Sequence, residues 1–373
     1  MKILLVTNEL SEQSGWGRYS LDLANHLKLA DHELVVVCRK INPVFSEFEQ
    51  IALLPDPLDY KKCYLFFWLY LSKIFEHRGK LKKADLIHCV VETYLPFSTI
   101  YSFFARVPLL ATVHGSFGVK ASRQSVYCLV QSLCYSWAKK IVCVSHYTEK
   151  RLLAVFPRVK TVVIPNGVDL KNFLFDNNEL SKSLDNPILI GVGAIKNRKG
   201  FHLVVKALPD ILKKFPKLKY YIVGRPEEMG YLKYLKDLIC ELNLEEHVVF
   251  FHNLTDEELK KLYEQASVFI LTPISDEYNF EGFGLVYLEA NAYGLPVVGS
   301  YDNGGEEAIA SGKTGFLAKA NDVESTSEEV INLLSDFSRY ATMSREALSW
   351  AKAHSWETIA SQYMQIYKQI HDN

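Results

Sequence analysis

The sequence predicts an α/β fold made of two doubly wound, parallel-sheet domains. Short, β-branched and mostly uncharged runs alternate with amphipathic helical patterns along most of the chain. A strand, a glycine-bearing loop and a helical pattern follow one another at the N-terminus and again from residue 187. With 373 residues, 49% of them hydrophobic and 23% charged, the chain is long enough for two full cores of the Rossmann type.

The first domain is expected at residues 1–170. It opens with a strand at 2–7, a polar loop that contains Gly15 and Gly17, and a helical pattern. These glycines lack the G-x-G-x-x-G spacing of a dinucleotide fingerprint, so a mobile loop over a diphosphate and a simple tight turn both remain open. Further strands of this domain are expected at 33–38, 84–91, 108–114 and 140–145.

A histidine, His114, ends the strand expected at 108–114. Ligands of open α/β sheets bind outside the carboxyl ends of the strands, so this position favours a functional role. A lone histidine is more often structural, and the two interpretations stay open on the residues alone.

The second domain is expected at 171–355, with a polar linker at 176–186. Its first strand, 187–193, ends in glycine and is followed by the cations Lys196, Arg198 and Lys199. Three cations at a strand end suit a diphosphate, although a solvated turn is the alternative. A capping box is expected at 255–258. The last segment, 356–373, is expected to be an amphipathic helix that packs back on the first domain.

The most specific stretch is 280–290. Two carboxylates lie eight residues apart, with two glycines and the start of a helical pattern between them. Bare amides at a helix start, approached through glycines, suit a phosphate, whereas carboxylates accept hydrogen bonds from hydroxyls. A ligand with both groups is a nucleotide-sugar, and the alternative is a surface loop with two solvated glutamates. The candidate residues are Glu281, Gly282, Phe283, Gly284, Leu285 and Glu289.

This stretch resembles the E-x7-E signature of retaining glycosyltransferases of family 4, also called glycosyl transferases group 1. Other ordered segments match the same family over nearly the whole chain: the N-terminal glycines, His114-Gly115, the I-P-N-G-V-D at 164–169, Lys199, and Gly304-Gly305. The resemblance implies the GT-B fold, in which two Rossmann-like domains enclose a cleft.

It also implies a function: transfer of a sugar, with retention, from a UDP- or GDP-sugar to a hydroxyl of a glycan, lipid-linked saccharide or small molecule. By the same resemblance, the first domain binds the acceptor, and the leaving diphosphate takes the acceptor's proton. Ala194 stands where the family usually has an arginine, and we expect Arg198 to supply that charge. The implied roles are Gly15 and Gly17 toward the donor phosphates, His114 on the transferred sugar, Lys199 and the amides of 282–285 on the diphosphate, Glu289 on the ribose and Glu281 on the donor sugar.

No metal or other cofactor is expected, because no D-x-D motif is evident and cations already occupy the phosphate site. Residues 1–170 hold 21 Lys and Arg against 14 Asp and Glu, and the remainder holds 21 against 29, which fits domains with different partners. Seven cysteines without a C-x-x-C pair argue against a disulfide framework or zinc site and indicate reduced thiols in a cytoplasmic protein. Neither a signal peptide, a membrane-spanning helix nor a nucleic-acid partner is expected.

Three alternatives stay open. A GT-B sugar-nucleotide epimerase has a similar outline, and a non-catalytic nucleotide-sugar-binding subunit would tolerate Ala194. The basic, aromatic stretch 60–83 is either a core helix with a basic end or a peripheral contact with the inner face of a membrane.

Overall fold

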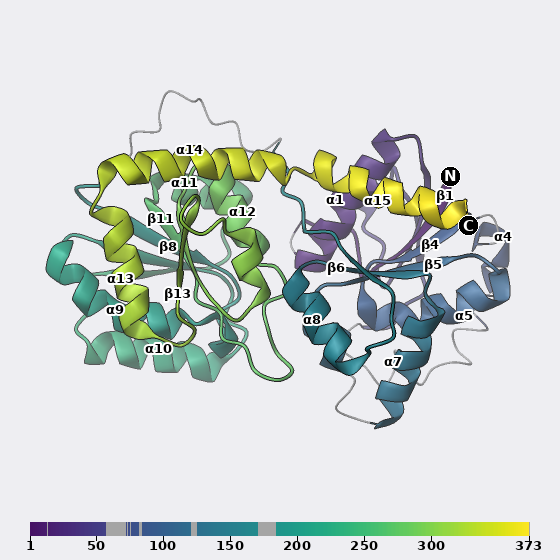
Figure 1. Cartoon of the computed structure of the whole chain (residues 1–373), viewed down its shortest axis with the longest axis horizontal. Coiled ribbons are helices and arrows are strands. Elements are labelled where there is room, and N and C mark those ends of the chain that lie inside the picture. The colour runs from purple at the N-terminus through teal and green to yellow at the C-terminus, as the bar shows by residue number, and fades with distance from the viewer. Residues whose placement is uncertain are drawn as a thin grey trace. The chain divides into compact units, whose positions relative to one another are not determined.

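The computed structural model describes residues 1–12, 14–56, 84–120, 125–170 and 184–372, together with 72, 74 and 76–81. The chain forms two compact units (Figure 1). Unit 1 comprises Met1–Gly167 and Trp356–Asn373, and unit 2 comprises Val168–Ser355. The unit boundaries thus fall after Gly167 and Ser355, where the sequence placed domain boundaries after 170 and 355.

Unit 1 is built on a seven-stranded parallel sheet in the order β3-β2-β1-β4-β5-β6-β7. The chain runs outward in both directions from β1 and β4, so the strand order reverses between them. Its strands are apolar and mostly buried, as expected for a parallel sheet covered on both faces. They are β1 (Lys2–Val6), β2 (Glu33–Cys38), β3 (Glu49–Ala52), β4 (Leu86–Cys89), β5 (Leu109–Val113), β6 (Lys140–Cys143) and β7 (Thr161–Val163).

Helices cover both faces of this sheet (Figure 1). They are α1 (Gly15–Leu29), α4 (Arg78–Leu81), α5 (Leu95–Ala105), α6 (Phe117–Lys120), α7 (Ser125–Trp137), α8 (His146–Val155) and α15 (Trp356–His371), with short 3-10 turns η1 (Pro43–Phe45) and η2 (Glu92–Tyr94).

The C-terminal helix α15 belongs to the core of unit 1, where it runs beside α1 (Figure 1). A buried polar network ties it to the sheet: the Tyr363 and Tyr19 hydroxyls hydrogen-bond, and His88 lies 2.7 Å from the Tyr367 hydroxyl and 2.8 Å from the Thr112 hydroxyl. Burial lowers the pKa of His88 to about 3, so its imidazole is neutral. The helix is therefore held by directional bonds as well as by apolar packing.

Unit 2 has a six-stranded parallel sheet in the order β10-β9-β8-β11-β12-β13, with its reversal between β8 and β11. Its strands are β8 (Ile188–Val192), β9 (Lys219–Val223), β10 (Val248–Phe251), β11 (Val268–Ile270), β12 (Val297–Ser300) and β13 (Gly315–Ala318).

The helices of unit 2 again pack on its sheet. They are α9 (Phe201–Lys214), α10 (Met229–Glu241), α11 (Asp256–Gln265), α12 (Leu285–Ala292), α13 (Val323–Leu334) and α14 (Phe337–Ala353), with 3-10 turns η4 (Asn197–Lys199) and η5 (Gly304–Ala308). The expected capping box is confirmed: the Thr255 hydroxyl accepts from the Glu258 amide, and the Glu258 carboxylate accepts from the Thr255 amide. No helix in the described ranges is long and apolar enough to cross a bilayer.

The anchoring of α15 predicts a large loss of stability for Tyr363→Ala. This side chain is fully buried and hydrogen-bonded, so its truncation should lower the free energy of unfolding by about 3–5 kcal/mol. Urea unfolding followed by tryptophan fluorescence measures the change. Gln365→Ala, on the exposed side of the same helix, is the control and should change stability by less than about 0.5 kcal/mol. Equal effects of the two substitutions would contradict the role of α15 in the core.

Candidate functional site

In unit 2, the loops after β8, β11 and β12 meet at the carboxyl edge of the sheet. The amide of Ile274 donates to the Arg198 carbonyl at 2.8 Å, and the Thr272 hydroxyl donates to the Gly200 carbonyl at 3.2 Å. The Gly304 amide donates to the Glu281 carbonyl at 2.8 Å. Because the strand order reverses between β8 and β11, this edge is the topological switch point at which open α/β sheets bind ligands.

An ion cluster lies where these loops meet. Arg198 Nη1 is 3.0 Å and Lys199 Nζ is 2.7 Å from the same oxygen, Oε2, of Glu281. The three side chains are only 26%, 12% and 15% exposed, respectively. Among the described residues, Oε1 of Glu281 makes no hydrogen bond. Glu281 is thus brought into direct contact with two sequence candidates, Arg198 and Lys199, that lie 83 and 82 positions before it in the chain.

The two cations hold Glu281 in its charged form. Burial by itself would raise the pKa of the Glu281 carboxyl, but the charges of Lys199 and Arg198 more than offset this and lower it to about 2. Burial also lowers the pKa of the Lys199 ammonium, although Glu281 lies beside it. Two cationic groups around one carboxylate leave the cluster suited to a further anion.

Glycines let the backbones of these loops approach closely. Gly284 caps α12 with φ +74°, and a Cβ there would lie 2.7 Å from the Tyr287 ring. A Cβ on Gly304 would clash with the carbonyl of Gly282. The Tyr287 hydroxyl donates to the Leu271 carbonyl at 2.7 Å, which fixes the helix on the end of β11. The start of α12, with its outward amides, is therefore held at the edge beside the ion cluster.

The remaining candidates of this stretch have different surroundings. Phe283 is 2% exposed and belongs to the core. Leu285 is the first residue of α12, and Glu289 lies half-buried one turn further along that helix. The two glutamates of the signature thus occupy separate places, Glu281 before the helix with its cations and Glu289 within the helix.

In unit 1, His114 follows directly after β5. Its Nε2 lies 2.9 Å from the Val90 carbonyl, and since a carbonyl only accepts, Nε2 carries the proton and Nδ1 remains an acceptor. Burial lowers the pKa of His114 to about 4, so the ring is neutral at neutral pH. The ring of Tyr19 packs edge-on against it with centroids 4.5 Å apart. His114 is therefore a fixed, uncharged group at the carboxyl edge of the first sheet.

A residue that the sequence analysis missed, Glu92, supports His114. It begins η2 after β4, is 1% exposed, and its Oε1 accepts from the His114 amide at 3.2 Å. Its Oε2 is buried and has no partner among the described residues. Burial raises the pKa of Glu92 to about 8, so it is a neutral acid at pH 7. A lone carboxylate directly after the strand expected at 84–91 was a signal for such a residue.

The structure corrects the expected N-terminal glycine loop. Gly15 and Gly17 form the first turn of α1, because the Ser14 hydroxyl caps the helix by accepting from the Gly17 amide at 3.1 Å. A Cβ on Gly17 would lie 2.6 Å from the Ser14 hydroxyl oxygen, whereas Gly15 faces open space. Gly17 is thus required by its own helix cap, and neither a mobile loop nor a tight turn is present there.

Two expectations are not settled by these observations. Most of the stretch 60–83, for which membrane contact was considered, lies outside the described residues. Within the part of the chain that is described, no group of three or more His, Cys, Asp or Glu is placed to hold a metal ion.

The fold of the two units is similar to that of solved glycosyltransferases. HepE of Anabaena, solved in complex with UDP and glucose, matches 99% of this chain and 100% of its own with a TM-score of 0.79 at 21% identity. Sucrose-phosphate synthase from Thermosynechococcus elongatus matches 99% and 98% of the two chains, with a TM-score of 0.77 and 24% identity. The expected fold class is confirmed: the chain has the GT-B architecture of two Rossmann-like, parallel-sheet units.

Family models then identify the chain more closely. Glycosyltransferase Family 4 matches residues 13–172, and Glycosyl transferases group 1 matches residues 173–350. The chain belongs to this family of glycosyltransferases, as the E-x7-E resemblance predicted.

Curated relatives agree over part of their length. A GDP-mannose-dependent alpha-(1-6)-phosphatidylinositol monomannoside mannosyltransferase of Mycolicibacterium smegmatis is 32% identical over 59% of this chain and 60% of the relative. A D-inositol 3-phosphate glycosyltransferase of Corynebacterium urealyticum is 30% identical over 57% of this chain and 52% of the relative. The matches therefore span between half and two thirds of these relatives.

The raised pKa of Glu92 predicts a pH-dependent effect of Glu92→Gln. Between its ordinary pKa near 4.5 and about 8, the unfolded chain loses the proton while the folded chain keeps it, so wild-type stability falls as pH rises through this window. Gln cannot ionise. Relative to wild type, the variant should therefore gain about 2–4 kcal/mol of stability on going from pH 4 to pH 8. Urea unfolding at a series of pH values measures this gain.

The control is Glu357→Gln on the exposed side of α15. Its stability should follow the wild-type curve at every pH. If the Glu92→Gln curve also ran parallel to wild type, Glu92 would not be a buried, protonated acid.

Proposed function

We propose that this protein is a retaining glycosyltransferase that moves a hexosyl group from a UDP- or GDP-sugar to a hydroxyl of an acceptor. The observation that carries the proposal is the contact of Arg198, Lys199 and Glu281 beside the start of α12 at the switch point of unit 2. It brings together cations, amides and a carboxylate, which are the groups that a nucleotide-sugar requires.

The leaving diphosphate binds to the cations of this cluster. Arg198 offers a planar fork and Lys199 a point charge, and both meet the negative charge that grows on the diphosphate as the glycosidic bond breaks. The amides at the start of α12, around Gly284 and Leu285, take further phosphate oxygens. No metal is needed in this scheme, because fixed cations already provide the charge.

The two glutamates act on different parts of the donor. Glu281 stays ionised because of its cations, and its Oε1 accepts from hydroxyls of the donor sugar and stabilises positive charge at the anomeric carbon. Glu289, further along α12, accepts from the ribose hydroxyls. The bond from the anomeric carbon to the diphosphate breaks, a bond to the acceptor oxygen forms on the same face, and the acceptor's proton passes to the diphosphate.

Unit 1 provides the acceptor side and His114. Because Nε2 of His114 donates to the Val90 carbonyl, its neutral ring presents Nδ1 as an acceptor for a hydroxyl of the transferred sugar. The ring orients the sugar and does not act as a general base. Gly15 and Gly17, in the first turn of α1, are assigned to the donor phosphates. The Gly17 amide already donates to Ser14, so the amide of Gly15 at the helix start binds the phosphate oxygens, and Gly17 allows the serine cap beside it.

The comparisons support this range of substrates. One curated relative is named for GDP-mannose and a lipid-bound inositol mannoside, and one structural neighbour was solved with UDP and glucose. We therefore assign a UDP- or GDP-hexose as donor and a glycan, a lipid-linked saccharide or a small molecule as acceptor. We assign the enzyme to the cytoplasm, where its acceptor is either in solution or at the inner face of the membrane.

A thermal-shift screen with UDP, GDP, ADP and their sugars tests the donor. A bound nucleotide at about 100 times its dissociation constant stabilises the protein by roughly 2.7 kcal/mol, which a melting curve detects. The stabilising donor should then be turned over by the purified chain, equally well with and without EDTA. Loss of turnover in EDTA with rescue by Mg²⁺ contradicts the metal-free scheme. A new epimer formed from the donor alone indicates an epimerase, and binding without turnover indicates a non-catalytic subunit.

The cluster predicts a strong effect of Arg198→Ala. Removing one donor to the developing diphosphate charge should lower turnover by about 10²–10³-fold. Adding Ala194→Arg to that variant should restore part of the rate, because it returns a guanidinium from the other end of the same loop.

Lys196→Ala is the matched control for this experiment. Lys196 lies on the same loop but pairs with Glu227 at 2.6 Å and makes no ion pair with Glu281, so its loss should change the rate by less than about twofold. If Arg198→Ala also changed the rate by less than about twofold, Arg198 would not bind the diphosphate, and Lys199 and the backbone amides would bind it without Arg198.

A further inference from the structure

Helix α7 in unit 1 presents an apolar side to its surroundings. Val126, Leu129, Leu133 and Trp137 recur every three or four residues and are 62%, 62%, 63% and 45% exposed. None of the 13 residues of α7 carries a charge. A helix side that faces water is normally polar, so this side is suited to a different environment.

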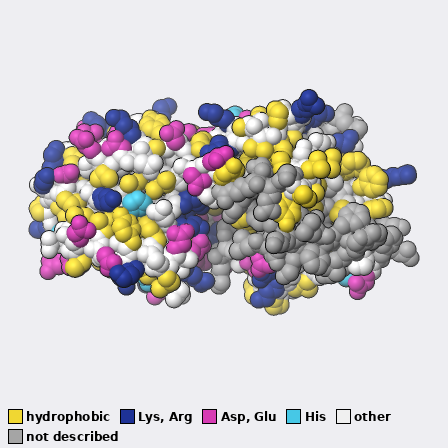
Figure 2. All heavy atoms as spheres, turned by 90° about the horizontal axis from the view of Figure 1, so that it is seen from below, with side chains coloured by type: hydrophobic (Ala, Val, Ile, Leu, Met, Phe, Trp, Pro, Cys, Tyr) yellow, Lys and Arg dark blue, Asp and Glu magenta, His cyan; other side chains and the backbone are white. Residues whose placement is uncertain are grey.

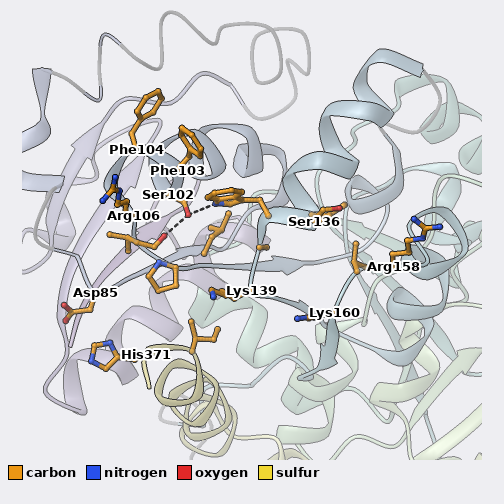
Figure 3. Close-up of a pocket in the computed structure, with 18 residues that line it drawn as sticks. Asp85, Ser102, Phe103, Phe104, Arg106, Ser136, Lys139, Arg158, Lys160 and His371 are labelled. Atoms are coloured by element: carbon orange, nitrogen blue, oxygen red, sulfur yellow. Dashed lines mark hydrogen bonds between the residues drawn. The ribbon is translucent and has the colours of Figure 1, made fainter. Parts of the chain in front are cut away.

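Aromatic residues of the neighbouring helix α5 extend this apolar surface. Phe103 and Phe104 are 58% and 53% exposed, and the Phe103 ring lies 5.4 Å from the Trp137 ring. The Trp137 indole donates to the Ser102 hydroxyl at 2.8 Å, which fixes the end of α7 on α5 (Figure 3). We call the exposed residues of α5 and α7 the α5/α7 face: Phe103, Phe104, Val126, Leu129, Leu133 and Trp137.

Cations border this face. Arg106 directly follows α5 and Lys139 follows α7, and with Arg158 and Lys160 they line an open groove of about 1020 Å³ (Figure 3). None of the four forms an ion pair with a described residue, and the one acid in the groove, Asp85, accepts from the Lys2 amide at 2.7 Å. The border is therefore positively charged and available to anions.

The sequence around the face has the same bias. Between Glu92 and Glu149 there is no Asp or Glu, whereas there are five Lys or Arg. Unit 2 does not have this basic bias on the side that Figure 2 shows, because acidic and basic side chains are mixed over it. An uncharged apolar face with a predominantly basic border is the pattern of a surface that binds an anionic membrane.

We propose that the α5/α7 face docks on the surface of an anionic lipid bilayer. The leucines and valine enter the boundary of the acyl chains, the rings of Trp137 and the phenylalanines lie at the interface, and Arg106 and Lys139 bind lipid phosphates. A protein partner would need an acidic border to match these cations, and a second copy of this face would oppose like charges. Charge complementarity therefore selects the bilayer.

This docking does not depend on the proposed transfer reaction, since it needs neither donor nor acceptor. The groove lies at the amino edge of the sheet, because Pro108, Lys139 and Lys160 directly precede β5, β6 and β7 or stand at their first residues. The basic border is therefore at the opposite edge of the sheet from His114.

Vesicle flotation tests the proposal with the full chain. The protein should float with vesicles of equal parts phosphatidylglycerol and phosphatidylcholine at low salt, and much less with phosphatidylcholine alone or at high salt. Leu129→Ser with Leu133→Ser should weaken binding at least about tenfold, because two apolar side chains no longer leave water. Arg106→Glu with Lys139→Glu should weaken it by a similar factor.

Matched controls come from exposed residues of unit 2. Met229→Ser with Phe337→Ser removes apolar side chains that are 69% and 55% exposed, and Lys236→Glu reverses an exposed charge, so all three changes should leave flotation unchanged. The proposal is overturned if wild type does not float with the anionic vesicles, if it floats equally with neutral ones, or if the Leu129 and Leu133 variant floats like wild type. A stable dimer that this variant splits, without any vesicle binding, would make a second copy the occupant.

Discussion

A single carboxylate oxygen, Oε2 of Glu281, holds together the candidate site of unit 2. Arg198 and Lys199 are neighbours of like charge that would repel each other in a partly buried loop, and sharing this oxygen offsets the repulsion. The same contact joins the loop after β8 to the loop after β11, so the start of α12 and the cations keep a fixed spacing. In the reaction that we propose, a diphosphate would meet donors that are already oriented.

In unit 2 an ion cluster fixes the charge of the edge groups, whereas in unit 1 burial fixes it. Its edge groups, His114 and Glu92, are both held in the uncharged form because charging them would require water that the core excludes. Tyr19 links them to the deeper network, since its ring packs on His114 while its hydroxyl bonds to Tyr363 of α15. The position of the edge histidine thus depends on a helix from the far end of the chain.

Local patterns in the sequence were sufficient for much of this structure. Apolar runs predicted β1, β2, β4, β5, β6 and β8, but not the edge strands β3 and β7 of unit 1. Thr255 and Glu258 predicted a helix start, and the spacing of Glu281 and Glu289 predicted the family. The missed features depend on contacts between distant parts of the chain, or on a local sequence that suits two structures equally well. Glu92 becomes significant only when β4 and β5 lie side by side, and Gly15 and Gly17 looked like a loop because a serine cap and a turn share the same residues. The apolar pattern of α7 indicates a buried side equally well, and only the fold shows that this side is open.

The discontinuity of unit 1 bears on how the chain is made. Unit 2 is continuous from Val168 to Ser355 and is complete before α15 leaves the ribosome, whereas unit 1 must wait for residues 356–373. Until then, the surface of unit 1 that later covers Trp356, Tyr363 and Tyr367 stays open, and His88 and Thr112 keep their mutual hydrogen bond but lack Tyr367 and Tyr363. A nascent chain in that state exposes apolar surface, which chaperones bind and which aggregates readily. Residues 356–373 thus act as a closing segment, and a ribosome that stops short of them releases a protein in which unit 2 is finished and unit 1 is not.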